Sequence, residues 1–160
     1  MAETFISEPF DQNTDASIVS EKPVLEHCLT FESGDFTIFI STEYVKEIIN
    51  NQTITLLPLL PPFIKGIINL RGQILPVVDT RIYMGKPEVE YTSRTCIIVL
   101  EVNSTSLGII VDSVQKVMDI DLKQVQPIPL NRQQKLLNGM INLESGKVLM
   151  SFDCDALLSN

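Results

Sequence analysis

The chain has 160 residues, 44% of them hydrophobic, and no apolar run approaches the roughly 20 residues that a membrane-spanning helix needs. Twelve lysines and arginines against twenty aspartates and glutamates give a formal net charge of −8. Such a charge repels nucleic-acid phosphates and anionic lipid, so we expect a globular protein with no nucleic-acid partner and no direct membrane insertion.

Residues 1–22 are predicted to form a disordered acidic tail. This segment carries five carboxylates among Ser, Thr, Asn and Gln, and its few apolar side chains cannot offset the entropy cost of ordering. Residues 1–21 contain no lysine or arginine and so lack the positive start of a secretory signal, which predicts a cytoplasmic protein. The three cysteines are far apart and outside any C-x-x-C spacing, which argues against a disulfide framework or a zinc site.

The first half of the remaining chain has the pattern of short strands. Apolar and β-branched residues on both sides of Ser33-Gly34-Asp35 predict a hairpin that ends with residues 36–40. Residues 45–49 favour a third strand, and the prolines after residue 57 interrupt any further pairing. Residues 63–65 are expected to form a single helical turn.

A central hairpin is predicted at residues 63–79, which read FIKGIINLRGQILPVVD. Asn69 and Gly72 are turn formers that bracket Arg71 between two runs rich in Ile and Val. The pattern therefore presents Arg71 at an exposed hairpin tip. On this stretch alone, a solvated turn cation is as good an interpretation as a binding residue.

The second half repeats the same kinds of signal. A short helix is predicted at 80–84, before Gly85, and a second hairpin at 95–102 and 107–111. Further elements are a strand at 114–118, a short polar helix at 131–137, strands at 139–143 and 148–152, and a terminal helical turn at 153–158.

The two halves also match each other, which indicates an internal duplication. Residues 36–40 align with 107–111, and residues 45–49 with 114–118. GIINL at 66–70 aligns with GMINL at 139–143, and both following strands end in aspartate. The offsets are 69 to 74 residues, so one unit of about five strands is used twice, and the two copies are expected to pack on shared apolar surface.

No pattern for catalysis or for a cofactor is present. His27 is the only histidine and is interpreted as structural, since no cluster around it has metal-ligand spacing. The sequence also lacks a phosphate-binding glycine loop and a nucleophile elbow. Asp79 and Asp153 lie at equivalent strand ends, which favours helix capping over a catalytic carboxylate pair. We therefore predict no enzyme activity and no cofactor.

The central hairpin, together with VKEII at 45–49 and LGIIVDSV at 107–114, resembles the CheW family of bacterial chemotaxis adaptors. The resemblance covers about residues 25–158. It implies a mainly β fold of two similar five-stranded SH3-like barrels with a few short helices, as one domain over 23–160 with intertwined subdomains at about 25–85 and 95–153. It also implies an adaptor that couples chemoreceptor cytoplasmic helix hairpins to the regulatory domain of the histidine kinase CheA.

The same resemblance assigns partner contacts to Arg71, Lys65 and Glu47, with Asn69 and Gly72 in the turn. It implies a receptor groove between the barrels, lined by aliphatics of the first repeat's strands and of residues 107–111. Two positions depart from the family pattern, since Thr80 replaces an aliphatic residue and Met84 a phenylalanine. The alternatives are an adaptor of another receptor–kinase pathway, such as surface motility, and a barrel that binds a small ligand or an oligonucleotide.

Overall fold

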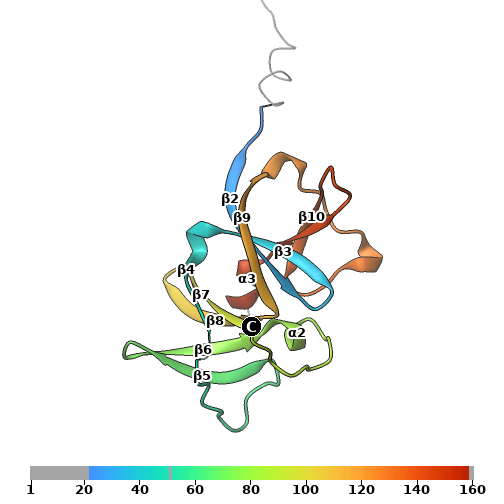
Figure 1. Ribbon diagram of the computed structural model, residues 1–160. Helices are drawn as coiled ribbons and strands as arrows, with labels where there is room; N and C mark the ends of the chain where they lie inside the picture. Colours follow the sequence, from blue (N-terminus) through green and yellow to red (C-terminus); the bar gives the residue numbers. More distant parts are fainter. Residues whose placement is uncertain (1–21, 51, 159–160) are drawn as a thin grey trace, which may run out of the picture.

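The computed structural model describes residues 22–50 and 52–158, so the predicted tail lies outside it except for Lys22. Strands dominate the described chain (Figure 1). In chain order the elements are β2 (Leu25–Ser33), β3 (Phe36–Ser41), η1 (Thr42–Tyr44), β4 (Val45–Ile49), β5 (Ile64–Leu70), β6 (Gln73–Asp79), α2 (Thr80–Tyr83), β7 (Cys96–Val102), β8 (Thr105–Val111), β9 (Ser113–Asp121), η2 (Leu122–Gln124), η3 (Leu130–Arg132), β10 (Leu137–Asn142), β11 (Val148–Phe152) and α3 (Cys154–Leu158).

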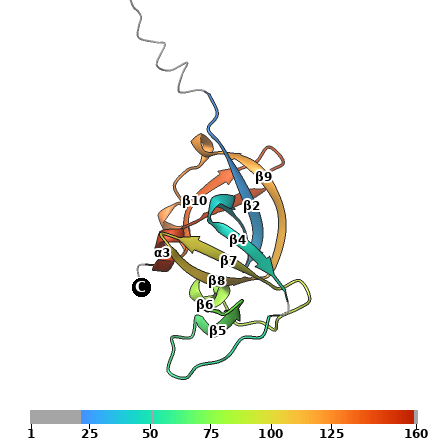
Figure 2. The same ribbon diagram turned by 90° about the vertical axis from the view of Figure 1, so that its left-hand side faces the viewer.

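The strands form two five-stranded sheets, in the orders β10-β11-β3-β2-β9 and β4-β7-β8-β6-β5. Figure 1 shows β2, β3, β9 and β10 in the upper part of the molecule and β5 and β6 in the lower part. The turned view in Figure 2 shows β4, β7 and β8 side by side across the middle. This architecture confirms the predicted mainly β fold of two similar five-stranded units with a few short helices.

Each sheet takes strands from both halves of the sequence. The hairpin β2-β3 of the first half lies with β9, β10 and β11 of the second, while β7-β8 lies with β4, β5 and β6. The exchanged pieces meet through parallel pairing, β11 against β3 and β6 against β8. The predicted boundaries at 25–85 and 95–153 are therefore wrong as limits of the two sheets, because tertiary pairing exchanges the first hairpin of each half.

The predicted duplication is visible in matching local contacts. An isolated bridge joins Thr55 to Ile67 in one half and Gln126 to Met140 in the other. The ladder shifts register just before Gly66 and again just before Gly139. Equivalent segments that are far apart in sequence therefore adopt the same strand geometry.

The two aspartates at the ends of β6 and β11 also act alike. Asp79 Oδ1 accepts hydrogen bonds from the backbone N–H groups of Arg81 at 3.0 Å and Ile82 at 3.3 Å, and Asp153 Oδ1 accepts from Ala156 N at 3.2 Å. Both carboxylates thus satisfy N–H groups that the first turn of a helix leaves without partners. The capping interpretation of Asp79 and Asp153 is confirmed.

The largest group of buried side chains joins the two sheets. It includes Phe31 of one sheet and Ile98 and Leu100 of the other, and each of these is fully buried. Along β7, Ile97 and Val99 belong instead to a second buried group within their own sheet, and a third group lies within the first sheet. Because alternate residues of a strand face opposite sides, β7 is apolar on both faces and reads as a continuous apolar run.

Two sequence predictions about helices are wrong. Residues 62–63 form a turn, closed by a hydrogen bond from Ile64 N to Pro61 O, and Ile64 already belongs to β5. In place of a polar helix at 131–137, the chain makes the short 3-10 helix η3 and then an irregular segment in which Leu136 is buried. Burial of this leucine requires the chain to turn into the core, which a continuous solvent-exposed helix does not allow.

Candidate functional site

The β5-β6 turn has the conformation that a two-residue hairpin loop requires. Arg71 and Gly72 both have positive φ, at 53° and 87°, as in the left-handed turns that match the twist of paired strands. Asn69 Oδ1 accepts a hydrogen bond from Gly72 N at 2.9 Å. Asn69 and Gly72 therefore shape the turn and hold Arg71 at its tip, as the sequence predicted.

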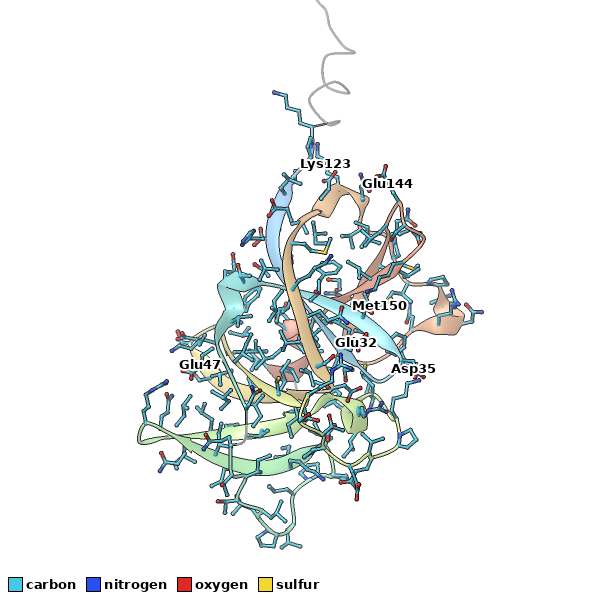
Figure 3. The ribbon with its side chains drawn as sticks, viewed as in Figure 1. Glu32, Asp35, Glu47, Lys123, Glu144 and Met150 are labelled. Atoms are coloured by element: carbon cyan, nitrogen blue, oxygen red, sulfur yellow. The ribbon has the colours of Figure 1, made fainter. Side chains whose placement is uncertain are left out.

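The Arg71 guanidinium binds the Glu47 carboxylate through two hydrogen bonds. Nη1 lies 2.5 Å from Oε1 and Nη2 lies 3.1 Å from Oε2. The Arg71 side chain is 73% exposed and the Glu47 side chain 28%. Glu47, labelled in Figure 3, is on β4, at the opposite edge of the sheet from β5. Its pair with Arg71 therefore joins β4 to the β5-β6 turn. The hydrogen bond from Arg71 lowers the pKa of Glu47 and raises that of Arg71.

Lys65 is separated from this tip. It is on β5, six residues before Arg71 in the turn, which corresponds to about 20 Å of extended chain. Its ammonium group donates to the Glu88 carboxylate and lies 5.8 Å from the centre of the Tyr91 ring. The structure therefore brings together four of the predicted site residues and places Lys65 in a different cluster.

Two neighbours of the tip, Gln52 and Ile74, were not among the predicted site residues. Gln52 donates its side-chain amide to the Asn69 carbonyl at 3.4 Å, which ties the segment after β4 to the turn. Ile74 pairs with Asn69 across the hairpin and is 55% exposed. Alternation along β6, with Leu75 and Val77 buried, marks Ile74 as outward facing, but that alternation becomes readable only once the register is known.

The predicted groove lining is partly wrong. Leu107, Ile109, Ile110 and Val111 are each 5% exposed or less and belong to the buried groups of the fold. Strand β8 is the central strand of its sheet, with β7 on one side and β6 on the other. Its side chains are therefore used for packing between and within the barrels and are not open to a partner.

The part of the chain that the structure covers contains no group of three or more His, Cys, Asp or Glu side chains placed to hold a metal ion. His27 Nδ1 lies 2.7 Å from Asp119 Oδ1 in an exposed contact between β2 and β9.

No helix within residues 22–50 and 52–158 is long and apolar enough to cross a bilayer. At the tip, the paired Arg71 and the exposed Ile74 both lie on the β5-β6 hairpin.

Comparison with known proteins places these features in a family. The model of the CheW-like domain family matches residues 27–160. Chemotaxis protein CheW of Klebsiella aerogenes is 31% identical over 147 residues, which are 90% of this chain and 88% of that protein. Chemotaxis protein CheW of Rhizobium meliloti is 30% identical over 132 residues, which are 81% of this chain and 84% of that protein.

The fold is similar to a solved structure as well. The crystal structure of the scaffolding protein TtCheW from Thermoanaerobacter tengcongensis superposes with a TM-score of 0.74 at 28% sequence identity. The match covers 82% of this chain and 90% of that one. Sequence and fold thus lead to the same set of relatives.

Proposed function

The chain belongs to the CheW-like domain family, whose relatives here are chemotaxis and scaffolding proteins, and we propose that it couples chemoreceptor cytoplasmic tips to the histidine kinase CheA. In this role the protein is an adaptor in the cytoplasm that reaches the membrane only through its receptor partners. It binds partners and catalyses no reaction. The observation that supports this most directly is the match of the family model to residues 27–160, which contain both sheets except for the first two residues of β2.

We infer that the partner surface centres on Arg71, Glu47 and the turn formed by Asn69 and Gly72. Glu47 takes two of the N–H donors of Arg71, and a guanidinium group has five, so donors remain for a carboxylate or carbonyl of a partner. The pair also holds the long arginine side chain in one place, which reduces the entropy lost on binding. Ile74 adds exposed apolar surface beside it.

Arg71→Ala tests this assignment in the purified chain. We expect about tenfold weaker binding to a receptor-tip fragment or to the CheA regulatory domain, because a close polar contact controls dissociation. The melting temperature should hardly change, since an exposed turn side chain contributes little packing. Arg94→Ala, which removes another exposed arginine, is the matched control and should bind like the unaltered chain.

A folded Arg71→Ala chain that binds both fragments with unchanged affinity would rule out this surface. A pull-down from the native cytoplasm separates the proposed pathway from its alternative. Recovery of CheA and chemoreceptors supports the proposal, whereas recovery of a different receptor–kinase set assigns the adaptor to another pathway, such as surface motility.

A further inference from the structure

The segment of residues 86–95, here called the strap, connects α2 to β7 without forming a helix or a strand (Figure 1). It is fixed at its start by Lys86, whose ammonium lies 3.6 Å from the Asp35 carboxylate and 5.2 Å from the centre of the Phe36 ring. Both of those residues follow β2 in the other sheet. The strap therefore begins against the first sheet and ends in the second.

A second fixation point uses Asp79. Its Oδ1 caps α2, and its Oδ2 accepts a hydrogen bond from the Tyr91 hydroxyl at 2.8 Å. Burial, reinforced by this bond to a carboxylate, raises the pKa of Tyr91, so the hydroxyl keeps its proton and remains a donor. Asp79 is only 4% exposed, and its cap bonds to α2 use Oδ1. Without the Tyr91 hydroxyl, Oδ2 would therefore be a buried acceptor with no donor from α2.

Lys65 provides the third fixation point. Its ammonium group binds the Glu88 carboxylate and faces the Tyr91 ring, so one β5 side chain contacts the strap at two positions. The Lys65 side chain is 22% exposed, whereas the Glu88 side chain is 61% exposed. Cation and ring contacts of this kind are stronger when they are partly withdrawn from water.

The strap lines a cavity of about 120 Å³ at the sheet that contains β4 and β5, here called the second barrel. The cavity is lined by Tyr91 of the strap, by Cys96, Ile49, Gln52 and Ile54, and by Ile97 of the buried group within that sheet. Gln52 is also the residue that donates to the Asn69 carbonyl next to Arg71. Gln52 therefore lines the same cavity as the strap and also bonds to the hairpin turn.

The hydrogen bond from Tyr91 to Asp79 can be compared with the equivalent position in the other half of the duplication. Asp153 is the equivalent of Asp79 and caps α3 in the same way. Among the residues that the structure places, no tyrosine donates to its carboxylate. Within the described residues, the bond from a tyrosine to the capping aspartate therefore occurs in the first half alone.

We propose that Tyr91 and Lys65 are positioning residues that latch the strap over the end of the second barrel and, through Gln52, hold the turn that carries Arg71. The second part of this proposal depends on the proposed partner surface. It gives Lys65 a role different from direct partner contact. Release of the latch should make the partly buried Cys96 thiol more accessible without unfolding the chain.

Alkylation of the three cysteines by iodoacetamide, resolved by mass spectrometry, tests the latch in the full chain. Burial raises the pKa of Cys28 to about 11 and that of Cys154 to about 12, so these two thiols should react slowly and act as internal reporters of unfolding. In Tyr91→Phe we expect Cys96 to react about tenfold faster, because loss of a hydrogen bond to a charged group favours local opening. Lys65→Met should increase the same rate by a smaller factor.

Tyr44→Phe is the matched control, since no hydrogen bond of the Tyr44 hydroxyl occurs among the described residues. Selective acceleration at Cys96 supports the latch. An unchanged rate at Cys96 in both Tyr91→Phe and Lys65→Met overturns it. Equal acceleration at all three cysteines also overturns it, because Tyr91 would then stabilise the whole fold.

Binding of the receptor-tip fragment separates this inference from the proposed function. If Tyr91→Phe opens Cys96 and also weakens binding severalfold, the link from strap to turn is supported. If it opens Cys96 and binding is unchanged, that link is wrong. If the unaltered chain binds neither receptor nor kinase fragment, the proposed function fails, while the alkylation rates still decide the latch.

Discussion

The loops that precede β5 and β10 occupy equivalent places in the two halves but bury their apolar side chains differently. Leu56 is 73% exposed and Leu59 102% exposed in the loop before β5. In the loop before β10, Ile128 is 7% exposed and Leu136 is 2% exposed, and both belong to the group of buried side chains that joins the sheets. An isolated bridge joins the residues on either side of each loop, Thr55 to Ile67 in the first half and Gln126 to Met140 in the second. The two loops therefore differ between equivalent backbone contacts.

This difference shows which parts of the duplicated unit are constrained. The strand ladders, bulges and helix caps match because each barrel must pair its backbone groups. The loops differ in how much they bury, since the loop before β10 adds two buried side chains to the shared core and the loop before β5 adds only the partly buried Phe63. The first loop leaves leucines in water, and its Leu59 also has a positive φ of 64°, which is unfavourable for a leucine. The predictions below test how far the equivalence of the halves extends.

The largest effect is expected at Gly66 and Gly139, which occupy equivalent positions in the two halves. A Cβ on Gly66 would lie 2.2 Å from the Thr55 carbonyl oxygen, which is backbone held by the bridge, so Gly66→Ala should destabilise the fold by about 3 kcal/mol or more. A Cβ on Gly139 would meet Val125 Cγ1 at 2.7 Å, which is a partly buried side chain and not a backbone atom, so Gly139→Ala should cost less, about 1–2 kcal/mol. Urea denaturation of both variants measures this, and equal losses would contradict the asymmetry.

Truncation in the two loops should show the next largest effect. Ile128→Ala leaves a cavity in the shared core and should cost about 2–3 kcal/mol. Leu59→Ala removes a side chain that is wholly exposed and should change stability by less than about 0.5 kcal/mol. Thermal unfolding followed by circular dichroism compares them. A large loss in Leu59→Ala would mean that its loop packs on the barrel in solution.

A smaller effect is expected where the halves use different chemistry at one position. Thr80 and Cys154 follow the two capping aspartates, and the Thr80 hydroxyl donates to the Ile110 carbonyl at 2.7 Å and lies 2.6 Å from the Ser33 hydroxyl. Both hydroxyls are fully buried. Thr80→Val should cost about 1–2 kcal/mol, because it leaves the carbonyl and Ser33 without a partner.

A double-mutant cycle with Ser33→Ala sharpens this prediction. Once Thr80 is valine, removing the second hydroxyl should cost less than it does in the unaltered chain. Strictly additive losses would show that the two hydroxyls do not act as a pair. Thr80, which departs from the family's aliphatic residue, thus has a specific partner in Ser33.

The smallest effect concerns charge. The positions equivalent to Glu47 and to the Arg71 tip hold Lys116 and Glu144 in the second half, and no ion pair joins these two described residues. The pKa of Glu47 lies below its ordinary value of 4.5. The ion pair therefore stabilises the fold at pH values above 4.5, and this stabilisation is lost as the pH falls through the lowered pKa. An NMR titration of the Glu47 carboxyl carbon should show the midpoint rise in Arg71→Ala and stay unchanged in Arg94→Ala. An unchanged midpoint in Arg71→Ala would contradict the pair.

The sequence determined the local structure of this protein. Turn formers at Asn69 and Gly72, alternating Ile and Val, and aspartates at strand ends specify hairpins and caps through interactions between residues close in the chain. The same signals, repeated at offsets of 69 to 74 residues, revealed the duplication. The resemblance carried by the central hairpin indicated the family before any contact was known.

Only the tertiary structure decided which strands lie together. The strand order of each sheet depends on the parallel pairing of β11 with β3 and of β6 with β8, which joins segments that are far apart in sequence. The same long-range packing buries β8, pairs Glu47 with Arg71, and places Lys65 against Glu88 of the strap. These contacts join residues more than twenty positions apart, and no local propensity encodes them.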